Sequence, residues 1–241
     1  MAKGKKVTRK QLLKEPDEFL TFSAKLFNII LKYRVQALGA IGGLILIVLA
    51  ISGFSYYAHR QASQAEAQLQ KSWNRYESLR NEKGSLEAYQ AVGPEFDQII
   101  SNYGGQPGGK AARVILANIC YDGGDADKAI ALYEIALEDF ADSFYRGQIL
   151  NGLGYAHEAK NELEKAAEYF ETTAAGSNVA LKGEALFNLG RLYGALGSIE
   201  KSKVAYQKII TEYPDSLYSD LAQERVGVTA VKSVVSASPT E

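Results

Sequence analysis

The stretch from Ala37 to Tyr57 contains 21 residues without a charge, most of them Leu, Ile, Val, Ala and Gly. A helix of this length covers about 30 Å, which matches the hydrocarbon core of a bilayer. A helix buried in a soluble core would be shorter and would show a polar face. Tyr33 precedes the stretch and Phe54 and Tyr56 lie at its far end, where aromatic rings favour the membrane interface. The sequence therefore predicts one N-terminal transmembrane helix.

A cleaved signal peptide is the main alternative for this stretch. Such peptides have a short basic leader and an apolar core of about 7–15 residues, followed by a small-residue cleavage site. Here 34 residues precede the core, the core is too long, and no convincing small-x-small cleavage site follows Tyr57. We therefore expect the helix to be retained as an anchor.

The charges on the two sides of the predicted span differ in sign. Before it stand nine basic and three acidic residues, a net charge of +6, whereas 17 basic and 25 acidic residues follow from Gln61 onward. Basic arms stay on the cytoplasmic side, so we expect a cytoplasmic N-terminus and a C-terminal domain that is periplasmic or otherwise extracytoplasmic. The acidic outer part also argues against nucleic acid as a partner.

The chain divides into five expected parts. Residues 1–36 form a basic arm, in which the apolar spacing over Pro16–Lys32 predicts an amphipathic helix at the membrane surface or a docking surface for a partner. Residues 37–57 form the span. Residues 58–109 hold a long connecting helix, uninterrupted until Gly84, and a degenerate repeat that is broken at Gly93-Pro94 and closed by a glycine-rich loop over 104–109. Residues 110–235 form a repeat domain with a capping helix that begins near Ser216, and we expect residues 236–241 to be disordered.

The repeat domain is indicated by small and aromatic residues at fixed offsets. Small residues follow a leucine at intervals of 37 and 36 residues, a second small residue comes 12 positions later, and an aromatic four positions after that. The three sets are Ala117, Ala129 and Tyr133; Gly154, Ala166 and Phe170; and Gly190, Ser202 and Tyr206. This pattern resembles the tetratricopeptide repeat, a helix hairpin of about 34 residues. The fold class is therefore all-α: a single N-terminal transmembrane helix followed by a helical-hairpin solenoid.

Physical reasons for this pattern follow from helix packing. Two helices approach closely only where side chains are small, and the aromatic residue fills the gap to the next hairpin. Gly124, Asn161 and Gly197 stand where the first helix of each hairpin must end in a left-handed conformation. Asp125 is expected to cap the helix that follows it.

Residues that could carry catalysis or bind a metal do not converge in the sequence. His157 and Cys120 occupy the repeat position of Tyr193 and are best explained as core residues. A lone cysteine makes no disulfide within the chain. The aspartates at 122, 125 and 127 lack the spacing of a calcium loop. We therefore expect no enzyme activity, no cofactor and no metal.

The first helices of the hairpins should form a concave surface for a partner. Amides, tyrosines and mixed charges suit an extended peptide, with amides pairing its backbone and rings holding its side chains. A solvated or covered surface is the alternative. The candidate partner-binding residues are Asn118, Tyr121, Asn151, Tyr155, Glu158, Asn188 and Arg191.

The order of parts, with a basic arm, one span and an acidic repeat domain, resembles the ancillary SecYEG translocon subunit (YfgM-type) family of Gram-negative inner membranes. That resemblance implies a single-pass inner-membrane protein that accompanies protein translocation or hands chains to periplasmic chaperones. Its partners would be the translocon, chaperones or extended client chains, with lipid around the span. The alternative is a permanent scaffold subunit of another envelope complex. Gly39 and Gly43 form a G-x-x-x-G pair at which another helix, or a second copy, could approach.

Overall fold

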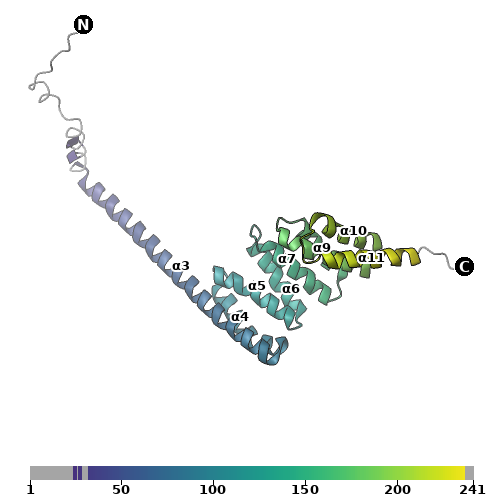
Figure 1. The fold of residues 1–241 in the computed structure, drawn as a ribbon. Helices are drawn as coiled ribbons and strands as arrows, with labels where there is room; N and C mark the ends of the chain where they lie inside the picture. Colours follow the sequence, from purple (N-terminus) through teal and green to yellow (C-terminus); the bar gives the residue numbers. More distant parts are fainter. Residues whose placement is uncertain (1–23, 26, 29–31, 237–241) are drawn as a thin grey trace, which may run out of the picture. The chain divides into compact units, whose positions relative to one another are not determined.

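The computed structural model describes residues 24–25, 27–28 and 32–236, and all secondary structure in these ranges is helical (Figure 1). It divides into two units, residues 1–59 and residues 60–241. The amphipathic helix expected over Pro16–Lys32 falls mostly on residues outside the described ranges. The same is true of the expected tail, apart from Ser236.

Helix α3 (Arg34–Lys83) contains the predicted span and continues to the residue before Gly84. Large apolar side chains of the span, such as Leu46, Leu49 and Phe54, are exposed, and none of the helix's most apolar window is buried within the protein. In the described part of the chain, this helix alone is long and apolar enough to cross a membrane. By length and composition it is a candidate span.

The second unit is a row of helices in which each helix packs against the next (Figure 1). Because the connections are short, consecutive helices form hairpins, and contacts also join α5 to α7, α7 to α9 and α9 to α11. One face of the row is thus made of alternate helices. The helices are α4 (Ser85–Tyr103), α5 (Pro107–Asp122), α6 (Ala126–Asp139), α7 (Arg146–Ala159), α8 (Leu163–Ala175), α9 (Val179–Ala195), α10 (Ile199–Glu212) and α11 (Ser219–Ser236).

The outer part of α3, from Arg60 onward, packs as a first helix in front of α4. Leu69 and Tyr76 are buried in one core with Val92 and Phe96 of α4. The hydroxyl of Tyr76 also donates to Asp122 of α5, at 3.4 Å. The packed array described by the structure therefore begins before the glycine-rich segment at 104–109.

Close helix contacts occur at the small residues of the repeat. A Cβ placed on Gly190 would lie 2.5 Å from the ring of Tyr206, and one placed on Gly154 would lie 2.7 Å from the ring of Phe170. The hydroxyl of Ser202 donates to the carbonyl of Gly190 across the same hairpin, at 2.6 Å. The spacing of 12 and 16 residues therefore marks real contacts between the two helices of a hairpin.

The left-handed turns predicted between the paired helices are confirmed. Gly124, Asn161 and Gly197 have φ of 87°, 61° and 74°. Asp125 caps α6 as expected, because its side chain accepts from the backbone N–H of Lys128 at 3.1 Å. Helix α11 begins at Ser219, slightly later than expected.

Two expected interruptions were wrong. Helix α4 continues through Pro94, where the preceding Gly93 has no Cβ to collide with the proline ring. The loop expected over 104–109 is shorter, because α5 already begins at Pro107. Glycines in its first turn permit close packing: a Cβ on Gly109 would lie 1.8 Å from the carbonyl oxygen of Tyr103.

Candidate functional site: a groove on the first helices

The expected binding residues lie on three helices that contact one another in order, α5, α7 and α9. Repeat spacing places equivalent side chains in rows across these helices. Asn118, Tyr155 and Arg191 occupy one such row, and Ala111, Gln148 and Glu184 occupy another. The structure brings most of the expected residues into two connected groups, described next.

The first group surrounds the carboxylate of Glu184, a residue that the sequence interpretation did not include in the site. Its Oε1 accepts from the side-chain amide of Asn151 at 3.0 Å and from the hydroxyl of Tyr155 at 2.6 Å. Asn188 donates to the oxygen of the same tyrosine at 2.8 Å. Burial raises the pKa of Tyr155, and its hydrogen bond to Glu184 raises it further, so the hydroxyl remains a donor. Helices α7 and α9 are thereby joined through one carboxylate.

The second group is an ion pair between the same two helices. Arg191 contacts both carboxylate oxygens of Glu158, with Nη2 to Oε2 at 2.6 Å. Nη2 also donates to Oδ1 of Asn188, at 3.3 Å, and so links the pair to the first group. The carboxylate raises the pKa of the Arg191 guanidinium, because it stabilises the charged form.

Asn118 and Tyr121 on α5 are placed differently. Asn118 is exposed and accepts from the hydroxyl of Tyr133 on α6, and no hydrogen bond joins it to the other candidates. The ring of Tyr121 lies 6.3 Å from that of Tyr155, centroid to centroid. Aromatic contact therefore links α7 to α5, whereas the amide network does not.

The three candidate amides differ in solvent exposure, and this difference indicates different roles. Asn151 and Asn188 are only 7% and 5% exposed, and their N–H groups are engaged by neighbouring side chains. They hold Glu184 and Tyr155 in place. Of the three candidate amides, Asn118 alone is open to solvent.

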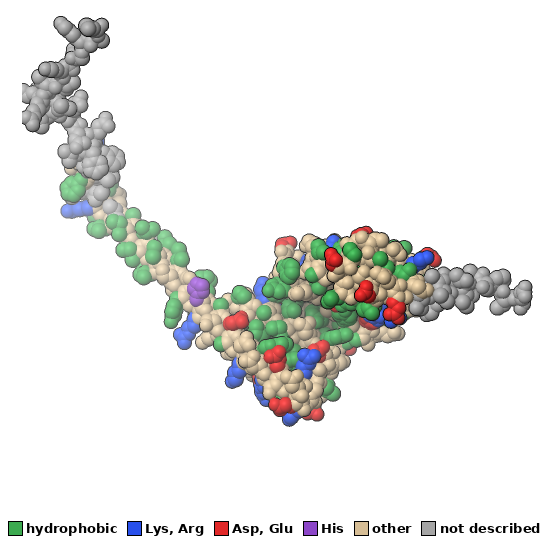
Figure 2. All heavy atoms as spheres, viewed as in Figure 1, with side chains coloured by type: hydrophobic (Ala, Val, Ile, Leu, Met, Phe, Trp, Pro, Cys, Tyr) green, Lys and Arg blue, Asp and Glu red, His purple; other side chains and the backbone are tan. Residues whose placement is uncertain are grey.

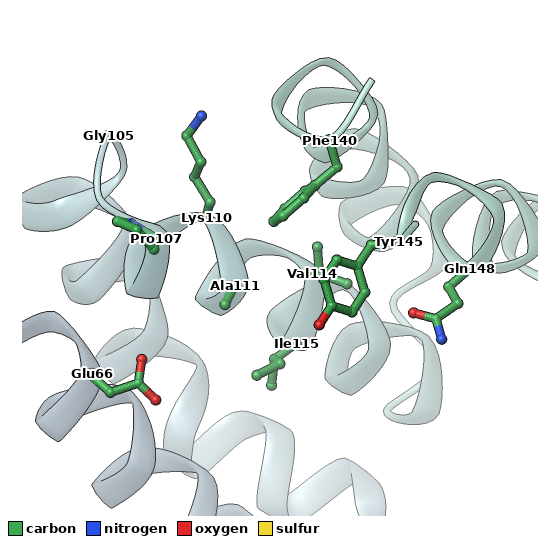
Figure 3. A pocket seen from close by; sticks show the side chains of 10 residues that line it. All are labelled: Glu66, Gly105, Pro107, Lys110, Ala111, Val114, Ile115, Phe140, Tyr145 and Gln148. Atoms are coloured by element: carbon green, nitrogen blue, oxygen red, sulfur yellow. The ribbon is translucent and has the colours of Figure 1, made fainter. Parts of the chain in front are cut away.

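A hollow of about 700 Å³ lies beside the first half of α5 and reaches Gln148 on α7 (Figure 3), and sequence reasoning missed it. Its walls are largely apolar, formed by the first half of α5 and by the connection between α6 and α7. Its aromatic rings, Phe140 and Tyr145, lie 5.8 Å apart in an edge-to-face arrangement. The one available sequence signal was Phe140, which stands at the end of its repeat as Tyr213 does. The lining residues are Glu66, Gly105, Pro107, Lys110, Ala111, Val114, Ile115, Phe140, Tyr145 and Gln148.

Charged side chains at the hollow, and Glu184 on the neighbouring helix, differ in whether they have a partner of opposite charge. Lys110 pairs with Asp139 at 3.2 Å, and Asp139 also binds Arg113. Neither Glu66 nor Glu184 has a lysine, arginine or histidine partner among the residues that the structure describes. In Figure 2, hydrophobic side chains gather on the viewed face of the repeat unit, with charged ones interspersed among them and at the edges. The surface is therefore apolar with two uncompensated carboxylates.

His157 and Cys120 lie in the packed interior. His157 is buried, stacks on Tyr169 with ring centroids 5.2 Å apart, and places Nδ1 2.7 Å from Glu162. Burial raises the pKa of the Cys120 thiol to about 11, so it is a poor nucleophile at neutral pH. Over residues 32–236 and the few described before them, no three His, Cys, Asp or Glu side chains are close enough to hold a metal ion.

The comparison of sequences assigns the chain to a family. The profile of the tetratricopeptide repeat-like domain matches residues 36–227, most of the chain. This protein belongs to the tetratricopeptide repeat-like domain family. No curated protein sequence matches the chain. Tetratricopeptide-type arrays are, in general, protein-interaction scaffolds that are typically non-catalytic.

Solved structures share the tetratricopeptide-like fold. One is a Podosopora anserina protein with nearly identical TPR-like repeats, described as a kinesin light chain, at TM-score 0.54 and 16% identity, covering 70% of this chain and 86% of that one. A variant of that protein with a single substitution gives a TM-score of 0.55 at the same identity, covering 70% of this chain and 85% of that one. BtubC (BKLC) from P. vanneervenii gives 0.50 at 14% identity, covering 76% of this chain and 94% of that one. At these identities the likeness concerns the fold alone.

Proposed function

We propose that this protein is a membrane-anchored interaction module whose groove binds a segment of another protein on the outer side of the inner membrane. In the specific form that we favour, it accompanies protein translocation or transfers emerging chains to periplasmic chaperones. The net charge of +6 before the span supports this orientation. The layout of arm, span and repeat domain supports the envelope role.

The observation that carries the proposal is the open apolar hollow beside α5. Ala111, Val114 and Ile115 line it while being only half-buried, although most apolar residues of α5 are fully buried. Concave apolar surfaces with a few fixed polar groups are typical binding sites. Next to the hollow, on α7 and α9, the Tyr155 hydroxyl and the Glu184 carboxylate hold each other in place. Such a surface suits an extended or helical peptide.

A photocrosslinking experiment in intact membranes tests the proposal. A photoreactive amino acid replaces Gln148, which lines the hollow, and a matched control places it at the exposed Glu138 on α6. We expect discrete crosslinked proteins from position 148 that are absent from position 138. The additional substitution Ala111→Phe, which fills the hollow, should abolish them. Equal products at both positions, or products unaffected by Ala111→Phe, would contradict a role for the groove.

The crosslinked products also distinguish the accessory function from the alternative, a permanent scaffold subunit. A translocation or chaperone accessory should crosslink several proteins, including nascent or unfolded chains, and the yield should fall when synthesis of exported proteins is blocked. A permanent scaffold should give one partner in constant yield. A single product that persists after such a block would therefore favour the scaffold function over the accessory function.

A further inference from the structure

Glu184 is a carboxylate that the fold holds in place without neutralising it. Both groups that bind its Oε1, the Asn151 amide and the Tyr155 hydroxyl, are uncharged. Its Oε2 makes no hydrogen bond or ion pair with any described residue. The nearby Arg191 is engaged by Glu158. Glu184 is half-buried, so its charge is less screened than that of a fully exposed group.

A second observation at the same place also indicates a missing donor. Asn151 is more than nine-tenths buried, and its Oδ1 has no hydrogen-bond partner among the described residues. Because Oδ1 and the Nδ2 that binds Glu184 belong to one amide, the unpaired oxygen lies beside the carboxylate. A buried acceptor without a donor is costly. A cationic side chain in the groove would pair with the free oxygen of Glu184.

The position of this carboxylate relative to the hollow follows from the repeat. Ala111 and Gln148 line the hollow, and Glu184 is the next residue in the same row, on α9. Packed helices lie about 8–10 Å apart. An extended chain advances about 3.3–3.6 Å per residue, so the single helix spacing from Gln148 on α7 to Glu184 on α9 corresponds to about three residues. A chain that crosses the first helices would meet the hollow and then Glu184.

We propose that the groove selects a partner segment with a large apolar side chain and, about three residues away, a lysine or arginine. The apolar side chain occupies the hollow at its α7 edge, next to Gln148, and the cation binds Glu184. Glu66, a carboxylate that lines the hollow, adds to the negative field that attracts such a segment. This inference rests on the proposed function and specifies the chemistry of the bound chain.

Fluorescence anisotropy with the full chain in detergent micelles tests the inference. The probe is a labelled Gly/Ser-rich peptide with one tryptophan and one arginine about three positions away, prepared in both orders. The comparison peptides replace the arginine by glutamine or the tryptophan by serine. The protein variants are Glu184→Gln, which keeps an acceptor for Tyr155, and the matched control Glu138→Gln, which removes a charge from the exposed face of α6. Ala111→Phe fills the hollow, and Ala131→Phe on the exposed side of α6 is its control.

We expect at least one order of the arginine peptide to bind about tenfold more tightly than its glutamine counterpart at low salt, since a partly desolvated charge pair supplies an effect of that size. Glu184→Gln should remove this preference, and Glu138→Gln should retain it. Ala111→Phe should weaken the binding of both peptides that contain tryptophan. Ala131→Phe should leave their binding unchanged.

An arginine preference that is absent, or that survives Glu184→Gln, overturns the inference. If peptides bind without that preference while position 148 still crosslinks partners, the inference fails and the proposed function stands. If no peptide binds and position 148 captures nothing, both fail.

Discussion

Two glycines in α9 should respond in opposite directions to the same substitution. A Cβ on Gly190 would lie 2.5 Å from the ring of Tyr206, whereas a Cβ on Gly194 would meet only the Ser202 hydroxyl, at 3.5 Å. The first distance is a collision and the second is an ordinary contact. Comparing Gly190→Ala with Gly194→Ala therefore isolates the helix contact on which the repeat pattern depends.

The magnitude follows from the packing around Tyr206. Carbon atoms pack at about 3.5–4.0 Å, so the ring must move by about 1 Å to admit the methyl group of Gly190→Ala. Tyr206 is only 4% exposed and its centroid lies 5.6 Å from that of Phe187, so this shift disturbs buried neighbours. Such overpacking costs about 1–3 kcal/mol. At either position alanine is favoured over glycine in a helix by about 1 kcal/mol. That contribution cancels when the stabilities of Gly190→Ala and Gly194→Ala are compared.

Thermal unfolding of the full chain in detergent, followed by circular dichroism, measures the difference. For a domain of this size 1 kcal/mol shifts Tm by about 2–4 °C, so Gly190→Ala should melt about 2–12 °C below Gly194→Ala. Gly194→Ala should melt at or above the wild type. Gly190→Leu should melt lower still. If Gly190→Ala and Gly194→Ala raise Tm equally, the assigned contact between α9 and α10 is refuted.

Three further predictions concern charge and topology. Glu158→Gln should lower stability by less than about 1 kcal/mol, because its pair with Arg191 is partly exposed, and the loss should vanish in high salt; a loss that persists there would contradict a screened ion pair. Hydrogen bonding to His157 and two lysines lowers the pKa of Glu162 from 4.5 to about 2. Its stabilisation is therefore complete above pH 4.5 and lost as the pH falls toward 2. The difference in Tm between wild type and Glu162→Gln should shrink over that window, and a constant difference would argue against this assignment. A reporter fused after Glu241 should be active only outside the cytoplasm, and activity inside would reverse the proposed orientation.

Much of the architecture could be predicted because its signals are local. The anchor candidate follows from the length of an uncharged stretch, and the ends of the first helices follow from Gly124, Asn161 and Gly197, whose left-handed conformations depend on neighbouring residues alone. The hairpin register follows from small residues such as Gly190, because a close helix contact excludes larger side chains. Local signals gave wrong predictions at Pro94, where a helix break was expected, and at Gly109, where a loop was expected. There, the residue before the proline and the close approach of Tyr103 decided the outcome.

The binding surface illustrates what the sequence alone determined and what tertiary structure decided. The repeat period placed Asn151, Tyr155 and Asn188 on the first helices, because position along a helix depends only on sequence spacing. Whether these groups face solvent or one another depends on the offset between α7 and α9, which no single helix encodes. That offset brings Asn151 and Tyr155 onto Glu184 and leaves its carboxylate without a cation among the described residues. The hollow beside α5 likewise exists only because separate helices and a connecting segment surround it. Sequence thus determined which residues lie on the first helices, and packing between helices decided which of them form the groove and remain available to a partner.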